Sequence, residues 1–286
     1  MRIAAFQIDV ALGNVSRNLE RMSAGLKTAV EEGARLAIFP ECSATGYCFN
    51  SAEEARALAE PIPGPITQQV VAACREHGLW AVFGMIEADG ERIFNAAVLA
   101  GPDGVAGVYR KVHLPYLGLD MFTTPGDRPF AVHEVEGVRI GMNICYDAAF
   151  PEAARCLAIL GADLIVLPTN WPPGAGCVAC SGISTRAMEN AVYYAAVNRI
   201  GVERGFRFIG QSSICAPDGS VLASAGALEE TVMFADIDVT RARRKLVIRV
   251  PDKHEIDRLA DRRPEMYTPL TQPHGLQTPR QRHRGK

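Results

Sequence analysis

"GARLAIFP" at residues 33–40 and "GADLIVLP" at residues 161–168 share one pattern, and this repetition decides the predicted fold. In each segment a short apolar strand follows a glycine and ends at a proline. Two further pairs occur in the same order: RIAAF (2–6) with RIGMN (139–143), and PDG (102–104) with PDG (217–219). A period of more than a hundred residues is too long for a solenoid. The sequence therefore predicts two related sub-structures within one domain.

Each half of the chain has the pattern strand, helix, strand, helix and hairpin. In the first half, helices are expected over 14–32 and 66–78, and strands over 36–40, 79–87, 93–100 and 105–109. We therefore expect two mixed sheets that pack on each other, with helices on their outer faces. Side chains at corresponding strand ends, such as Glu41 and Cys145, should then meet at one rim.

Composition limits the possible partners. The chain has 286 residues, 48% of them hydrophobic, and a net charge of −2. No long basic run precedes the C-terminal tail, so neither nucleic acid nor an anionic membrane is expected as a partner. After Pro264, Pro, Gln, Arg and Thr dominate, and such a composition cannot form its own core. We expect a body at 1–263 and an extended tail at 264–286 that is partly disordered or crosses to another subunit.

The N-terminus and the cysteines indicate a compartment. The first residues, MRIAAFQID, alternate as in a strand and lack both a charged leader and a long apolar run, which predicts a cytoplasmic location. Eight cysteines are scattered through the chain, and this distribution predicts free thiols rather than a disulfide framework.

Cys145 is the first candidate for chemistry. It stands where the apolar strand VRIGMNI ends and FPEAARCLAIL, with Pro151 near its first helical position, is about to form a helix. Backbone amides near a helix N-terminus favour thiolate, the form that attacks carbonyl carbon. On its own, a single cysteine is by base rate more often a buried structural residue than a nucleophile.

Glu41 and Lys111 supply the other groups that a nucleophile needs. Glu41 follows a strand of apolar residues, where a carboxylate meets little water and its pKa rises. Lys111 follows the second strand of the predicted hairpin. Taken alone, they fit a solvated loop acid and a surface lysine. Together with Cys145 they form a nucleophile, a base and a cation.

Three segments resemble the signatures of the nitrilase superfamily of carbon-nitrogen hydrolases. They are FPECSATGY (39–47), YRKVHLPY (109–116) and GMNICYDAAFPE (141–152), and their order and spacing also agree. LPTNWP (167–172), RAMENAVYYAAVNRIG (186–201) and DRRPEMY (261–267) extend the resemblance to about residue 270. It implies a four-layer αββα sandwich, a homodimer or larger assembly, and an active site without metal or cofactor.

The resemblance also implies the roles of the site residues. Cys145 would be the nucleophile, Glu41 the general base, and Lys111 the cation that stabilises the oxyanion together with the backbone N–H of Tyr146. Family members usually carry a second glutamate before a Pro-Gly, but LGLDMFTTPG at 117–126 contains none. Asp120 is the nearest acid, so it either replaces that glutamate or caps a turn.

The same comparison favours an amide as substrate. Cys145-Tyr146-Asp147 is similar to the amidase branches, whereas true nitrilases typically have Cys-Trp-Glu here. N-carbamoyl hydrolases usually place arginines after the cysteine, but this chain has alanines, which disfavours an acidic substrate. The expected pocket residues are Tyr47, Tyr146, Asn170 and Trp171, although a tryptophan after a buried strand is also common packing.

Other readings remain open at this point. Cys145 could pair with His113 as a thiol-imidazole couple. Cys177-x-x-Cys180 suggests zinc or redox chemistry, but no second such motif accompanies it, and we expect a loop without metal. The chain could also hydrolyse an N-carbamoyl amine or a nitrile, or keep the fold and bind a small molecule without turnover.

Overall fold

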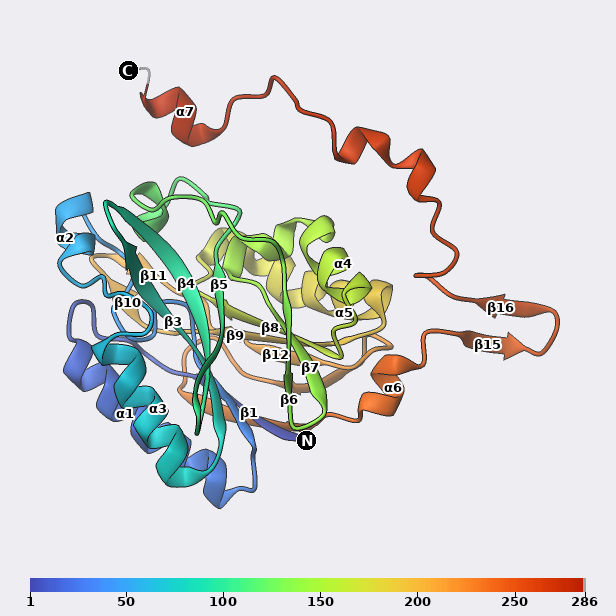
Figure 1. Cartoon of the computed structure of the whole chain (residues 1–286), viewed down its shortest axis with the longest axis horizontal. Helices are drawn as coiled ribbons and strands as arrows, with labels where there is room; N and C mark the ends of the chain where they lie inside the picture. The colour runs from blue at the N-terminus through green and yellow to red at the C-terminus, as the bar shows by residue number, and fades with distance from the viewer. Residues whose placement is uncertain (285–286) are drawn as a thin grey trace.

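Two six-stranded sheets form the centre of the computed structural model, which describes residues 1–284 (Figure 1). The first sheet has the order β14 (Thr231–Asp236), β1 (Arg2–Gln7), β2 (Leu36–Ile38), β3 (Trp80–Asp89), β4 (Arg92–Gly101) and β5 (Gly104–Arg110). The second has the order β6 (Val132–Val135), β7 (Val138–Met142), β8 (Leu164–Thr169), β9 (Tyr193–Asn198), β12 (Ser213–Cys215) and β13 (Val221–Ser224).

The two sheets have the same topology. In the first, β1, β2 and β3 are parallel, while β14 and β4 pair antiparallel at either side and β5 adds to β4. In the second, β7, β8 and β9 are parallel, with β6 and β12 antiparallel at either side and β13 added to β12. The pseudo-repeat predicted from the paired sequence segments is therefore confirmed.

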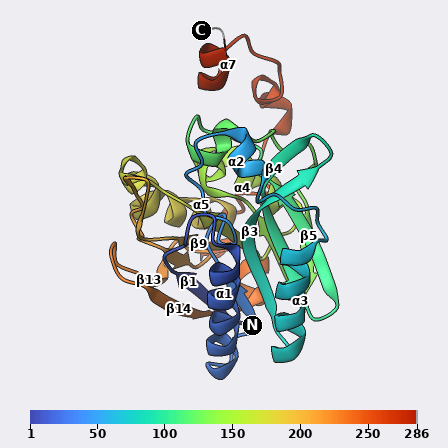
Figure 2. The same ribbon diagram turned by 90° about the vertical axis from the view of Figure 1, so that its left-hand side faces the viewer.

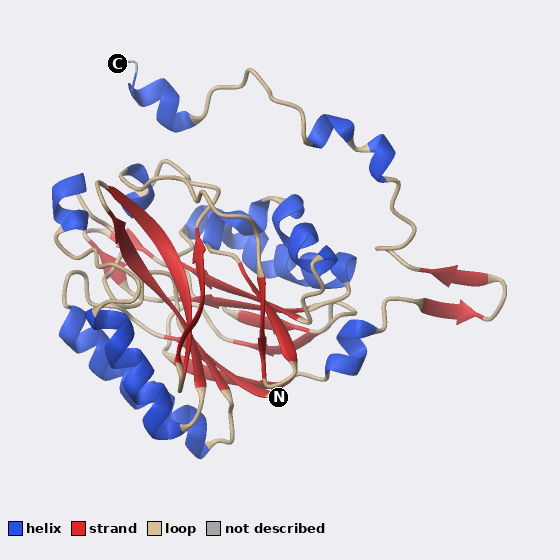
Figure 3. Ribbon diagram, in the orientation of Figure 1, coloured by secondary structure: helices blue, strands red, loops and turns tan. Residues whose placement is uncertain are grey.

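Helices cover the outer faces of both sheets (Figures 2 and 3). α1 (Val15–Glu31) and α3 (Pro65–His77) lie on the first sheet, and α4 (Pro151–Ile159) and α5 (Ile183–Asn190) lie on the second. The side chain of Asn14 caps α1 by accepting from Arg17 N at 3.1 Å, and α3 ends at Gly78, whose φ of +65° suits glycine. The predicted αββα sandwich is confirmed.

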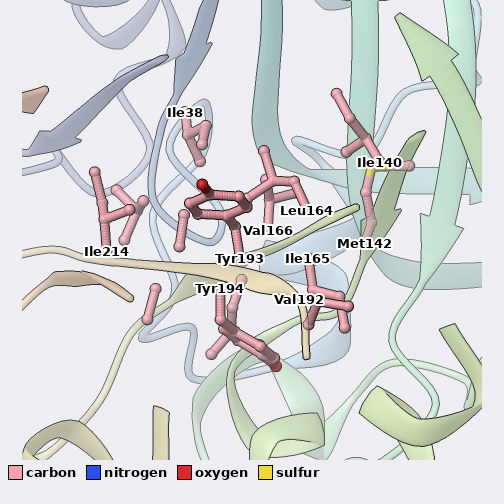
Figure 4. Packing of buried hydrophobic residues seen from close by; sticks show 14 of the residues in the cluster. Ile38, Ile140, Met142, Leu164, Ile165, Val166, Val192, Tyr193, Tyr194 and Ile214 are labelled. Carbon is pink, nitrogen blue, oxygen red and sulfur yellow. The ribbon is translucent and has the colours of Figure 1, made fainter. Parts of the chain in front are cut away.

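Neighbouring side chains along a strand point to opposite faces of the sheet and therefore pack in different parts of the hydrophobic core. Ile38 of β2 packs in the cluster between the sheets, whereas the next residue, Phe39, packs against Leu26 of α1. Figure 4 shows the same alternation in β9, where Tyr193 lies on the side of Ile38 and Tyr194 on the opposite side. A shift of one residue in the register would exchange these two environments, so burial on both faces fixes the register.

The rim of the sandwich collects the ends of several strands. β2 leads into Glu41, β7 leads through two residues into Cys145, and β8 ends at Thr169. Lys111 directly follows β5. The sheets thus bring residues from four distant segments to one edge, as the strand-end argument predicts.

Shorter elements connect this framework. They are α2 (Ala52–Arg56), the hairpin β10 (Val202–Glu203) and β11 (Phe206–Arg207), the 3₁₀ turns η1 (Gly118–Met121), η2 (Cys145–Ala149) and η3 (Pro173–Ala175), and the π-helical turn η4 (Val178–Gly182). Within residues 1–284, no helix combines the length and the apolar character needed to cross a bilayer.

The segment of Cys177 and Cys180 is helical, so the predicted loop is wrong. A helical turn at 176–177 continues through η4 into α5 without a break. The π turn places one extra residue in the helix, a feature that short sequence patterns do not reveal.

The chain leaves the body after α6 (Val239–Arg243). β15 (Val247–Val250) and β16 (His254–Ile256) form a separate hairpin that projects outward, followed by η5 (Pro264–Met266), η6 (Thr268–Leu270) and α7 (Pro279–Arg284) (Figure 1). The boundary at residue 263 stays a prediction.

Gly84 of β3 allows the turn after β2 to lie close to the sheet. A Cβ at Gly84 would lie 2.1 Å from Cys42 N and 2.8 Å from Glu41 Cα, and both neighbours are backbone atoms. We predict that Gly84→Ala lowers the free energy of unfolding by about 1–3 kcal/mol, because the turn must move. Urea unfolding measures this change.

Gly176→Ala is the matched control, since nothing lies within 4 Å of the added carbon and the backbone there is helical. Equal unfolding free energies for the two variants would contradict the close approach at Gly84.

Candidate active site

Cys145 occupies a strained turn at the end of β7. Its φ is +47°, a left-handed value that non-glycine residues rarely adopt. The carboxylate of Asp147 holds this turn by accepting from Ile144 N at 2.9 Å, while Asp147 N donates to Ile144 O at 3.0 Å. The thiol is thus fixed in direction by its backbone and is 7% exposed.

Asp147 also connects the cysteine turn to the strand that leads to Lys111. Tyr109 OH donates to its Oδ2 at 2.8 Å, and the backbone N–H of His113 donates to its Oδ1 at 3.1 Å. Since Tyr109 and His113 flank Lys111 in sequence, Asp147 fixes the nucleophile relative to the ammonium. This positioning role of Asp147 was not predicted from the sequence, where the residue served only to distinguish amidases from nitrilases.

Lys111 lies between two buried carboxylates. Its Nζ is 2.7 Å from Glu41 Oε1 and 2.5 Å from Asp120 Oδ2, and all three side chains are fully buried. Asp120 stands on η1, and its carboxylate reaches the ammonium directly instead of capping a turn.

Asn95 and Tyr47 complete the cluster. Asn95 Nδ2 donates to Glu41 Oε1 at 2.7 Å and to Asp120 Oδ1 at 2.9 Å, and Tyr47 OH donates to Asp120 Oδ2 at 2.8 Å. The second oxygen of Glu41, Oε2, is buried and is left without a hydrogen-bond partner among the described residues. Asn95 was not predicted from the sequence, although a lone amide in the apolar strand IFNAAVLA was a usable signal.

Burial and the neighbouring charges change the pKa values of Glu41 and Lys111. Burial raises the pKa of the Glu41 carboxyl, against the nearby Lys111 ammonium, and repulsion from Asp120 raises it further. For Lys111, burial alone would lower the pKa, but Asp120 and Glu41 outweigh it and hold the pKa well above its ordinary value. Lys111 is therefore a permanent cation, and Glu41 readily holds a proton.

Cys145 is a thiol at rest, which corrects the expectation of a thiolate. Burial and the charge of Glu41 raise the pKa of Cys145 to about 12, although Lys111, the Thr169 hydroxyl and the backbone at Asn170 oppose the rise. The physical reason is burial, and no long helix begins at the cysteine to oppose it: Cys145 begins only a short 3₁₀ turn, and α4 starts six residues later at Pro151.

A cavity of about 280 Å³ opens above the thiol. Its lining is Tyr47, Pro115, Leu117, Cys145, Tyr146, Ala149, Trp171, Pro172, Gly174, Ala175 and Val178. Three of the four predicted pocket residues are thus in the wall, and none of the residues that line the cavity carries a charge, because the Cys145 thiol is protonated. Asn170 is not in the lining; its backbone N–H faces the Cys145 sulfur instead.

The geometry supports neither a pair of Cys145 with His113 nor a metal site at Cys177 and Cys180. His113 Nδ1 lies 2.7 Å from Asp147 Oδ1, and its ring stacks on Phe150 with a centroid separation of 3.7 Å, so its partner is an aspartate. Cys177 and Cys180 are exposed free thiols. In the part of the chain that the structure describes, no group of three or more His, Cys, Asp or Glu side chains is arranged to hold a metal ion.

Comparison with known proteins identifies the family. The model of the carbon-nitrogen hydrolase family matches residues 2–245. The chain belongs to this family. The carbon-nitrogen hydrolase is 38% identical over 272 residues to a nitrilase from Pyrococcus abyssi, covering 93% of this chain and 99% of the relative. It is 35% identical to an (R)-stereoselective amidase from Pseudomonas sp., covering 92% of both chains.

Solved structures agree with this assignment. The E41Q mutant of the amidase from Nesterenkonia sp. AN1, with acrylamide added at its active-site cysteine, aligns with a TM-score of 0.79. The two chains are 27% identical, and the alignment covers 94% of the carbon-nitrogen hydrolase described here and 99% of the amidase. With these relatives, the protein is an enzyme that cleaves carbon-nitrogen bonds.

The raised pKa of Glu41 has a consequence for stability. The folded state binds the proton of Glu41 more tightly than the unfolded chain does. The stabilisation of the folded state by Glu41 is therefore largest at pH values below 4.5, the ordinary pKa of the carboxyl group, and is lost as the pH rises through the pKa of the folded state. Gln at this position does not titrate. We predict that the unfolding free energy of Glu41→Gln, relative to the unmodified protein, increases from pH 5 to pH 8. Each tenfold difference in proton affinity between the folded and unfolded states contributes about 1.4 kcal/mol.

Urea unfolding at four pH values measures this trend. Glu91→Gln is the control, because Glu91 is exposed at the turn after β3. A difference between Glu41→Gln and the unmodified protein that stays constant with pH would show that burial does not raise the pKa of Glu41.

Proposed function

We propose that this carbon-nitrogen hydrolase is an amidase that converts small uncharged amides into carboxylic acids and ammonia through a thioester on Cys145. One observation carries the proposal: a buried carboxylate with one unpaired oxygen, Glu41 Oε2, lies with a permanent ammonium beside a buried thiol at the floor of a cavity. The proposal requires neither metal nor cofactor.

The first step is attack on the amide carbonyl. Because the pKa of Cys145 is about 12, the proton must leave as the sulfur attacks, and Glu41 Oε2 is the acceptor. The rise in the Glu41 pKa by burial makes this transfer less costly. A C–S bond forms, and the carbonyl oxygen becomes an oxyanion.

The oxyanion needs donors that are already in place. Lys111 Nζ supplies one donor, because its ammonium group has three N–H groups and the two carboxylates accept from only two of them. The backbone N–H of Tyr146 supplies another, since the first hydrogen bond of η2 is made by Asp147 N and Tyr146 precedes it.

Collapse of the intermediate and hydrolysis reverse the proton transfers. The proton on Glu41 passes to the nitrogen, the C–N bond breaks, and ammonia leaves a thioester. Glu41 then removes a proton from water as its oxygen attacks the thioester carbonyl. The C–S bond breaks and the sulfur takes the proton back from Glu41, which restores the thiol.

Asp120 keeps Lys111 in this geometry in place of the usual second glutamate. Its carboxylate is one methylene shorter, and the turn η1 brings the backbone close enough for a 2.5 Å contact with Nζ. Replacing it by asparagine would leave Lys111 with only one carboxylate.

The cavity supports an uncharged substrate. Its wall is formed by aromatic, proline and small aliphatic residues, among them Ala149, and its lining includes no arginine that could bind a substrate carboxylate. Burying a carboxylate against such a wall without a partner would cost several kcal/mol. Nitrile hydrolysis is the second candidate, favoured by the 38% identity to the Pyrococcus abyssi nitrilase.

We predict that the purified enzyme releases ammonia from propionamide and isobutyramide. The expected kcat/KM is at least about tenfold higher than for succinamic acid, N-carbamoylglycine and propionitrile. Cys145→Ala abolishes turnover, and Glu41→Gln and Asp120→Asn each lower kcat by roughly 10²–10⁴-fold because proton transfer or the position of Lys111 is lost. Mass spectrometry of quenched reactions should detect the acyl group on the Cys145 peptide.

His113→Ala tests the rival pair, and it should retain activity within about tenfold because His113 acts only through Asp147. No ammonia from any amide, with ligands still bound, would contradict the proposal and favour a binding protein. Faster turnover of propionitrile than of the amides would favour the nitrilase instead.

We also propose that the protein works in the cytoplasm as a homo-oligomer. Free cysteines, three of them exposed, suit a reducing compartment. The hairpin β15–β16 stands away from the body and exposes Ile248 and Val250 by 45% and 46%. A lone two-stranded hairpin is marginally stable in water, and a second copy of the chain would cover this surface.

We predict that sedimentation velocity gives at least twice the mass of one chain, and that Ile248→Glu with Val250→Glu reduces it because charge is placed in the contact. Leu228→Glu, at a residue that is 71% exposed elsewhere on the surface, is the control. A monomer at micromolar concentration would contradict the assembly.

A further inference from the structure

The C-terminal tail returns to the body at its last helix. Figures 1 and 2 show the chain leaving the sandwich at β15–β16 and bending back until α7 lies beside the loops above the sheets. Between residues 263 and 283 the side chains are exposed, with one exception: Arg280 of α7 is partly buried. This partial burial marks a place where the tail contacts the body.

Two contacts join α7 to one loop. Arg280 Nη2 donates to the carbonyl oxygen of Met121 at 2.7 Å. The imidazole of His283 stacks on the ring of Tyr116, with centroids 4.2 Å apart and planes inclined by 6°. One contact lies at each end of the segment 116–121, so both ends of this segment are held from outside.

This segment carries two parts of the active site. Leu117 forms part of the cavity wall, and Asp120 holds the ammonium of Lys111. On the inner side, the segment is attached by Leu119 N, which donates to Tyr47 O at 2.8 Å, and by the Tyr47 hydroxyl on Asp120. Its only regular structure is the four-residue turn η1, so its own hydrogen bonds give it little rigidity.

We propose that α7 braces the segment 116–121, and that Arg280 and His283 are positioning residues for Asp120 and Leu117 in the proposed amidase reaction. A cationic donor on a backbone carbonyl is stronger than a neutral one, and a stacked ring restricts Tyr116 without adding charge. The contacts of α7 oppose outward movement of the segment 116–121 from the solvent side, and the hydrogen bonds of Tyr47 oppose the same movement from the inner side. A shift of about 1 Å at Asp120 would disturb Lys111 and slow the reaction.

The kinetic test uses the full chain with propionamide. Arg280→Ala combined with His283→Ala should lower kcat/KM by roughly 10- to 100-fold, with KM raised through Leu117 and kcat lowered through Asp120. Arg280→Lys with His283→Phe should restore most of the activity, because it keeps a donor and a ring. Arg282→Ala removes the same charge from the same helix and should leave the kinetics unchanged.

Double-alanine kinetics equal to those of Arg282→Ala would overturn the proposal. If Arg280→Lys with His283→Phe is no more active than the double-alanine variant, the contacts assigned to Arg280 and His283 would be overturned. Urea unfolding of the body should stay the same in all variants, because α7 lies outside the sandwich.

Hydrogen exchange provides a readout that does not need turnover. In the double-alanine variant, the amides of Leu119, Asp120 and Phe122 should exchange about tenfold faster than in Arg282→Ala. The rates should not depend on protein concentration, because the brace is formed within one chain. An inactive unmodified enzyme would defeat the proposed function but leave this readout intact, whereas unchanged exchange in an active enzyme would defeat the brace alone.

Discussion

The ammonium of Lys111, held between the carboxylates of Glu41 and Asp120 in a site closed to water, is the interaction on which the rest of this enzyme depends. Burying three charged groups costs several kcal/mol for each, and only close pairing offsets that cost. Burial raises the pKa of Glu41 against the attraction of the Lys111 ammonium, repulsion from Asp120 adds to the rise, and the carboxylate is thereby prepared to accept the thiol proton.

Such a cluster is maintained only because the surrounding framework is rigid. Lys111 directly follows β5, Glu41 follows β2 after two residues, and Cys145 follows β7 in the other sheet, so the packing of the two sheets fixes their separation. Asp120 is different, because it stands on a short turn in a loop. The structure compensates with contacts on both sides of that loop, from Asn95 and Tyr47 within and from α7 outside.

The reactivity of Cys145 also depends on its position in the structure more than on the intrinsic properties of its thiol. A thiol whose pKa is about 12 is nearly inert by itself, and its left-handed backbone is unfavourable by itself. Asp147 holds the strained turn, and Glu41 supplies the base at the moment of attack.

The sequence by itself determined the repeated strand and helix order and the three segments that supply Glu41, Lys111 and Cys145, because these follow from local periodicity and from motifs of contiguous residues. It pointed to Asp120 without deciding its role, and it missed Asn95, the positioning by Asp147 and the helical form of 177–180. Only the tertiary structure decided these. Hydrogen bonds such as those of Asn95 join residues 25 and 54 positions apart, and the pKa of Cys145 depends on burial, on the charges of Glu41 and Lys111 and on hydrogen bonds from residues 169–170. Such quantities depend on distances in space, which periodicity and spacing along the chain do not specify.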